Sequence, residues 1–102
     1  MAYLVNLTAR AQRDLAQLYA DIDAEHSDTA LKWYRGLKKA IFSLEEAPNR
    51  CPPAPEKKDL RHLLHRSKSQ IYRVIFRVIE KDKRVDVLHI RHGARRPTKS
   101  LR

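Results

Sequence analysis

The apolar residues of this sequence recur with the period of a helix in its first half and with the period of a strand in its second half. The first stripe has spacings of four, three and four residues and consists of Ala11, Leu15, Leu18 and Ile22. Such spacing places the side chains on one face of a helix. Because the Thr8 hydroxyl can cap it, the predicted helix begins after Thr8 and runs to about Glu25 or His26.

A second stripe has the same helical spacing and consists of Leu31, Tyr34, Leu37, Ile41 and Leu44. Ser27 or Asp28 can cap this helix, and Pro48 follows its end. Gly36 either weakens the helix, by about 1 kcal/mol relative to alanine, or lets the first helix approach closely. Since the break between the stripes is short, we expect an antiparallel helical hairpin.

The segment APNRCPPAPEKKD, residues 47–59, holds four of the five prolines. Neither a helix nor a central strand tolerates this composition, so it is predicted to be a loop. We expect it to join helices and strands within one domain, 1–102, whose last residues, 97–102, form a loose tail. The only cysteine, Cys51, lies in this loop and is interpreted as a bystander thiol, since it has no partner for a disulfide or a multi-cysteine zinc site.

Four segments read as strands. QIYRVIFRVIE (70–80) is the strongest, because it is rich in β-branched and aromatic residues; the others are 2–7, 60–66 and 85–91. The predicted order is β-α-α-β-β-β. It indicates an α+β fold in which an antiparallel sheet is packed on one face by the helical hairpin.

Alternation along each strand assigns the two faces of this sheet. The side chains predicted to face the core are Tyr72, Val74, Phe76, Val78, Leu88 and Ile90. Those predicted to face away are Ile71, Arg73, Ile75, Arg77, Ile79, Val87, His89 and Arg91. A face that mixes cations with apolar residues is typical of a binding surface, although a solvated face with arginine stems covering isoleucine is the alternative.

The net charge of +10 is distributed unevenly. Residues 1–48 carry 6 basic and 7 acidic side chains, and residues 49–102 carry 16 and 5, so the excess lies in the C-terminal half. Such asymmetry favours a polyanionic target or an acidic partner. The sequence has neither a membrane-length apolar run nor a secretory signal, which makes the cytoplasm the expected location.

The stretch VLHIRHGARR, 87–96, begins as a strand and ends as a group of histidines and arginines. It is either a site for an anion or a solvated basic edge. We expect Gly93 to permit a sharp turn, so that Arg95 folds back beside His92 while Arg96 stays at the rim. No metal or cofactor is expected.

Several segments together resemble the RelE/ParE superfamily of bacterial type II toxins. They are YLVNLTARAQRDLAQLYADI at the N-terminus, LEEAP and LRHLL around the loop, YRVIFRV, and VDVLHIRHGARR. The resemblance covers nearly the whole chain and rests on the order and spacing of these segments. It implies a small toxin that a cognate antitoxin neutralises.

The superfamily divides by mechanism. RelE-like members cut mRNA on the ribosome, and ParE-like members block DNA gyrase. If this chain is RelE-like, the resemblance gives a catalytic role to Arg73. His89 or His92 could then serve as the base or the acid, because imidazole titrates near neutral pH. Phosphate binding would then fall to basic side chains, which are Arg61, Arg73, Arg77, Arg91, Arg95 and Arg96.

The sequence departs from the nuclease pattern because no tyrosine follows Tyr72, whereas several RelE-like nucleases have one near the C-terminus. The leading hypothesis is therefore a ParE-like toxin that poisons DNA gyrase. The alternative is a RelE-like mRNA interferase with ribosome and mRNA as its targets. A third class, a plain nucleic-acid-binding module, stays open; neither helix has the basic face of a recognition helix.

Overall fold

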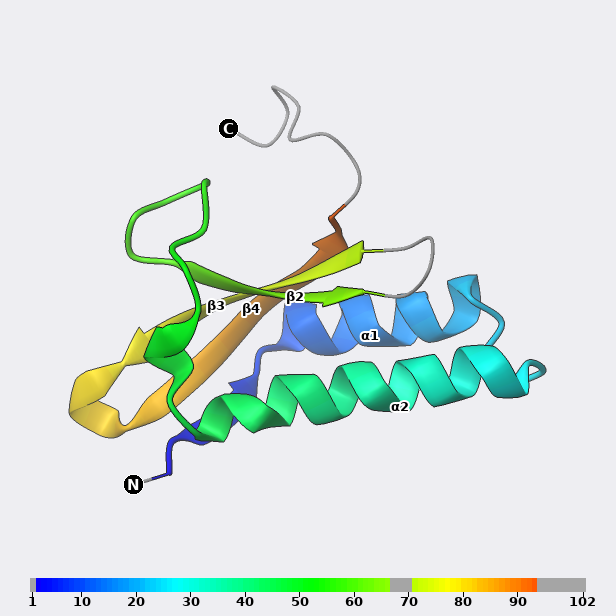
Figure 1. Ribbon diagram of the computed structural model, residues 1–102, viewed down its shortest axis with the longest axis horizontal. Coiled ribbons are helices and arrows are strands. Elements are labelled where there is room, and N and C mark those ends of the chain that lie inside the picture. The colour runs from blue at the N-terminus through cyan, green and yellow to red at the C-terminus, as the bar shows by residue number, and fades with distance from the viewer. Residues whose placement is uncertain (1, 67–70, 94–102) are drawn as a thin grey trace.

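The computed structural model describes residues 2–66 and 71–93. Its elements follow the order β1 (Leu4–Leu7), α1 (Ala9–Asp21), α2 (Asp28–Phe42), β2 (Arg61–Arg66), β3 (Ile71–Ile79) and β4 (Arg84–His92). Short 3₁₀ turns occupy Ser43–Glu45, Pro48–Arg50 and Glu80–Asp82. The predicted α+β fold with β-α-α-β-β-β order is confirmed, and the two helices cover one face of the sheet (Figure 1).

Both helices begin where the capping residues indicated. The Thr8 hydroxyl accepts a hydrogen bond from the Ala11 amide, and the Ser27 hydroxyl accepts one from the Ala30 amide. α1 ends at Asp21, several residues earlier than expected, because the chain turns there and Asp23 adopts a positive φ of 57°. The helix starts can thus be predicted from the sequence, because the capping side chains are local. The end of α1 depends instead on the turn that follows it.

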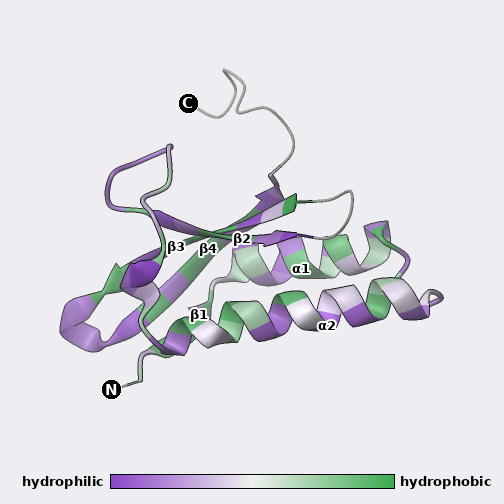
Figure 2. Cartoon of the chain, viewed as in Figure 1, coloured by the Kyte–Doolittle hydropathy of each residue, from purple (hydrophilic) through white to green (hydrophobic). Residues whose placement is uncertain are grey.

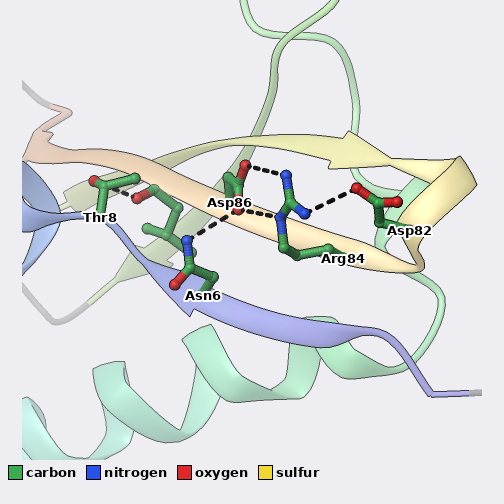
Figure 3. Close-up of polar contacts among 6 residues, drawn as sticks. Asn6, Thr8, Asp82, Arg84 and Asp86 are labelled. Carbon is green, nitrogen blue, oxygen red and sulfur yellow. Dashed lines mark hydrogen bonds and ion pairs between the residues drawn. The ribbon is translucent and has the colours of Figure 1, made fainter.

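The sheet has the strand order β1-β4-β3-β2. β2, β3 and β4 are antiparallel neighbours, whereas β1 lies parallel to β4 at one edge. A side-chain contact also joins this edge pair, because the Asn6 amide of β1 donates to Asp86 of β4 (Figure 3). Arg84, on the same strand as Asp86, binds Asp86 and also Asp82 of the preceding turn. The Thr8 hydroxyl donates to the Val87 carbonyl at 2.8 Å, which ties the start of α1 to the same strand.

The main core lies between the helices and the sheet. Its largest fully buried side chains are Phe76, Leu37, Ile41, Leu44, Val74, Val85 and Val87. Both helical stripes contribute side chains to this core. Figure 2 shows hydrophobic positions, in green, on both helices and on the strands that they cover. The face predicted for β3 is confirmed, because Tyr72, Val74, Phe76 and Val78 all belong to this cluster.

A bulge changes the faces of β4. Ile75 pairs with His89 and the next residue, Phe76, pairs with Val87, so Leu88 is left without a partner. A bulge inserts one extra residue and thereby interrupts the alternation of side chains. As a result Val87 is fully buried in the core and Leu88 packs on the opposite face, so the predicted faces of these two residues were wrong, while Ile90 faces the core as predicted.

Candidate functional site

The outer face of the sheet is centred on Arg73 of β3. Its two terminal guanidinium nitrogens donate to the two carboxylate oxygens of Glu56, each at 2.6 Å, and its Nε donates to His62 Nδ1 at 3.1 Å. Only 7% of Arg73 is exposed, although it was predicted to lie on an open face. All the donor-bearing nitrogens of this guanidinium therefore have partners within the chain.

The proline-rich loop brings Glu56 to this position. Pro53 forms a β-bridge with Arg61, and the Ala54 amide donates to the Leu60 carbonyl. The two ends of the 54–60 segment therefore lie side by side, and the segment forms a closed loop before β2. Ala54 and Leu60 pack on Ile75 in a second, smaller apolar cluster. This cluster fixes the base of the loop on the outer face and places its tip over Arg73.

Electrostatics in this cluster favour a charged carboxylate and a neutral imidazole. Hydrogen bonding from Arg73 holds the pKa of Glu56 below its usual value. Burial lowers the pKa of His62, and the nearby Arg73 charge lowers it further. Glu56 is thus an anion at neutral pH, and the unprotonated Nδ1 of neutral His62 can accept the hydrogen bond from Arg73 Nε.

Gly93 lies directly behind the Arg73 side chain. A methyl group added at Gly93 would lie 2.8 Å from Arg73 Cγ, closer than a methyl carbon can approach, and 3.2 Å from Ile71 Cγ2, which is a tight contact. Gly93 has no positive φ. The glycine is needed here for the close approach of Arg73 to the backbone, and the expected fold-back of Arg95 lies outside the described residues.

Two further cations predicted to bind an anion have internal partners. Arg61 donates to the Cys51 carbonyl and anchors the start of the loop. Arg77 Nε lies 3.3 Å from Asp59 Oδ2, an ion pair without hydrogen-bond geometry. Sequence reasoning assigned no role to Glu56 or Asp59; the available signal was that both are acidic residues in the loop that precedes a strongly basic segment.

His89 makes its side-chain contacts at the sheet edge, with the first helix. Its Nδ1 lies 2.7 Å from Asp14 Oδ2, and its Nε2 lies 3.3 Å from an Arg10 nitrogen. The same Asp14 oxygen accepts the Ile90 amide at 2.9 Å, at a part of β4 that β1 does not reach. These contacts give His89 a structural connection that was not predicted.

Arg91 lies beside the Arg73 cluster, whereas His92 lies on the helix-covered face of the sheet, because its register partner is Tyr72. Arg91 is the register partner of Arg73 on β4, so the two side chains share a face. The His92 ring contacts the Tyr72 ring, their centres 4.9 Å apart, and Tyr72 also contacts Trp33 at 5.3 Å. Arg95 and Arg96, the other two predicted cations, lie outside the described residues.

Within 2–66 and 71–93, no group of three or more histidine, cysteine or acidic side chains is arranged to hold a metal ion. The same residues include no helix long and apolar enough to cross a membrane. The main polar feature of the outer face is therefore the Arg73 guanidinium, with the Glu56 carboxylate of the same chain bound to it.

A family model described as the ParE toxin of the type II toxin–antitoxin system parDE matches residues 5–97. The chain therefore belongs to the ParE toxin family of type II toxin–antitoxin systems, and the predicted membership of the RelE/ParE superfamily is confirmed. No curated protein matches the sequence.

Solved structures share this fold at low sequence identity. The chromosomal ParDE system from P. aeruginosa is 22% identical, with a TM-score of 0.70 over 89% of this chain and 96% of that chain. The intact RelBE toxin–antitoxin complex of E. coli is 21% identical, with a TM-score of 0.64 over 92% and 100%. The RelBE2 complex from Mycobacterium tuberculosis is 23% identical, with a TM-score of 0.64 over 92% and 94%.

Proposed function

We propose that this toxin inhibits growth by acting on DNA gyrase, and that it does not cleave mRNA. The observation that carries the proposal is the state of Arg73, the cation that a RelE-like mechanism would use. Glu56 occupies both of its terminal nitrogens, and the side chain is buried. The match to the ParE family model over most of the chain supports the same choice.

RNA cleavage requires a base for the 2′-hydroxyl proton, an acid for the leaving oxygen and a cation for the charged transition state. Glu56 takes one donor of each terminal nitrogen of Arg73, so a phosphate would have to displace it to bind this arginine through two parallel hydrogen bonds. Both nitrogens of His89 contact side chains of α1. The chain thus holds two of the candidate catalytic groups in internal contacts, whereas inhibition by binding a protein needs none of them.

A cognate antitoxin is the proposed partner in the cell. The excess of positive charge in residues 49–102 favours a partner with an acidic surface. The similar ParDE and RelBE structures are toxin–antitoxin systems, which supports a paired partner for this chain as well. Because DNA gyrase, the proposed target, works in the bacterial cytoplasm, we propose the cytoplasm as the location of the toxin.

The proposal is tested by supercoiling of relaxed plasmid DNA by gyrase in the presence of the purified chain. We expect supercoiling to fall as the chain is added, and to be restored when the antitoxin is added first. A parallel reaction with translating ribosomes, followed by 5′-end mapping of the mRNA, should yield no new ends.

The opposite result identifies the alternative. New mRNA ends that disappear in Arg73→Ala and His92→Ala variants, with gyrase unaffected by the same preparation, would make the chain an mRNA interferase. Circular dichroism of each variant distinguishes loss of a reacting group from loss of folding.

A further inference from the structure

The basic side chains of the N-terminal half gather on one element, α2. Four of the six lysines and arginines in residues 1–48 lie in this helix, whereas only one of the seven acidic residues, Asp28, does. The other acidic residues come before or after α2, within 14–25 and at 45–46. The charge count of this half, which is close to neutral, therefore conceals a helix whose four basic side chains and one acidic side chain give a net charge of +3.

α2 lies along the lower side of the molecule in Figure 1 and contacts other elements on three of its sides. Leu37 is fully buried in the core. Trp33 Nε1 donates to the Arg66 carbonyl of β2 at 3.4 Å, and the Tyr34 hydroxyl donates to the Leu15 carbonyl of α1 at 3.3 Å. The fourth side of the helix, opposite Leu37, is therefore the side that faces away from the rest of the molecule.

Three exposed cations lie on this fourth side and form the α2 stripe: Lys32, Arg35 and Lys39. Within 2–66 and 71–93 none of their side chains forms a hydrogen bond or an ion pair. The spacings of three and four residues make them neighbours along the helix, and like charges at these spacings destabilise it. A solvated helix face is stabilised by alternating charges, so a row of like charges indicates a surface that an external anion neutralises.

We propose that the α2 stripe binds the phosphate backbone of duplex DNA. The inference deepens the proposed function and rests on it, because a protein that acts on gyrase meets that enzyme together with its DNA substrate. With a rise of 1.5 Å per residue, neighbouring cations of the stripe are spaced by about 4.5 and 6 Å along the helix axis. A single phosphate group cannot contact the whole row, whereas a polymer of phosphates can.

The side chains of α2 favour a duplex over a single strand. Proteins that bind single strands stack the bases on aromatic rings, but the two rings between Lys32 and Lys39 are turned away, Trp33 toward β2 and Tyr34 toward α1. Phe42, which is 43% exposed, lies beyond the last cation of the stripe. Contacts from cations to phosphates position a protein on DNA without reading its bases, so binding should not depend on DNA sequence.

The test is the salt dependence of binding to a short fluorescent DNA duplex, measured by anisotropy between about 50 and 200 mM salt. The stripe variant carries Lys32→Gln, Arg35→Gln and Lys39→Gln, since glutamine keeps the helix propensity. Each phosphate contact contributes about 0.9 to the slope of log K against log salt concentration, so the slope should become shallower by about 2.7. The affinity at about 100 mM salt should fall by tenfold or more.

A matched control variant removes the same charge elsewhere, through Lys57→Gln, Lys58→Gln and Lys81→Gln. These three lysines are exposed and form no ion pair among the residues that the structure describes. The control should keep the slope of the wild-type chain. Equal losses in the two variants would mean that net charge alone is responsible, and this result would overturn the proposal, as would an unchanged slope in the stripe variant.

A titration with poly-glutamate separates DNA from an acidic protein surface as the partner. A stripe variant that loses binding to poly-glutamate but keeps its binding to DNA would assign the stripe to an acidic protein and overturn the proposal. If circular dichroism shows that the stripe variant does not fold, Lys32→Gln and Lys39→Gln carry the test singly, each with a slope shallower by about 0.9. Neither titration contains gyrase, so failure to bind DNA is distinguishable from failure to inhibit supercoiling.

Discussion

The two glycines of this chain serve different purposes at the residue scale. Gly36 lies inside α2, where an added methyl group would be 3.7 Å from the His65 ring, an ordinary contact distance. The expected close approach of α1 is not what this glycine provides, since its nearest neighbour belongs to β2. Gly93, by contrast, lies against the stem of a buried arginine.

Replacing each glycine by alanine should therefore change stability in opposite directions. Gly36→Ala should stabilise the fold by about 0.5–1 kcal/mol, because alanine favours the helix and meets no obstruction. Gly93→Ala should destabilise it by about 1–3 kcal/mol, because Arg73 must move. Urea unfolding of both variants measures this difference, and a stabilising Gly93→Ala would contradict the role given to the close contact.

At the scale of elements, Asp14 joins α1 to the free edge of β4. Its carboxylate accepts both the Ile90 amide and the His89 ring, and its side chain is 22% exposed. β1 ends its pairing at Val87, and beyond that point no described strand pairs with this edge of β4. Asp14 supplies an acceptor at this place, a role that sequence periodicity did not reveal because it concerns two elements 75 residues apart.

We expect Asp14→Ala to cost about 1–3 kcal/mol, since it leaves the Ile90 amide without its acceptor. Asp21→Ala provides the control on the same helix: Asp21 is exposed and binds only Gln17, so its replacement should change stability by less than about 0.5 kcal/mol. Equal unfolding free energies for the two variants would show that the Asp14 contacts contribute nothing.

For the whole molecule, the acidic residues of the basic half are used internally. All five acidic side chains in residues 49–102 form ion pairs with basic side chains of that half: Glu56, Asp59, Glu80, Asp82 and Asp86. The positive excess is therefore carried by the lysines and arginines outside these five ion pairs.

Stability of the whole domain should fall as the pH is lowered from 7.5 to 5.5. Burial lowers the pKa of His62 and of His65 in the folded chain, so the unfolded chain binds protons more readily in this window. The lowered pKa values of Glu56 and Asp86 act in the same direction, but only below about pH 4.5, where the unfolded carboxyl groups take up protons.

Urea unfolding midpoints at the two pH values measure this decline. Replacing His62 and His65 together by glutamine should flatten it. His26→Gln, at an exposed position, should leave it in place, because His62 and His65 remain. A decline of undiminished size in the double variant would exclude these two histidines as its origin.

The sequence by itself determined the elements, their order, the helix caps, the core face of β3 and the position of the charge excess. Each of these follows from neighbours along the chain: side-chain period, a hydroxyl beside its own amide, or composition. The resemblance to the RelE/ParE superfamily rests on the same order of segments, and the family match confirms it.

Only the tertiary structure decided the parallel pairing of β1, the bulge that buries Val87, and the closure of Glu56 on Arg73. Alternation cannot register an extra residue in a strand, because the bulge depends on how β3 and β4 align. Likewise Glu56 and Arg73 are 17 residues apart, and their contact depends on where the small cluster around Ile75 holds the loop. Contacts between segments that are distant in the chain determine the chemistry of the outer face of the sheet. Local sequence patterns cannot predict such contacts.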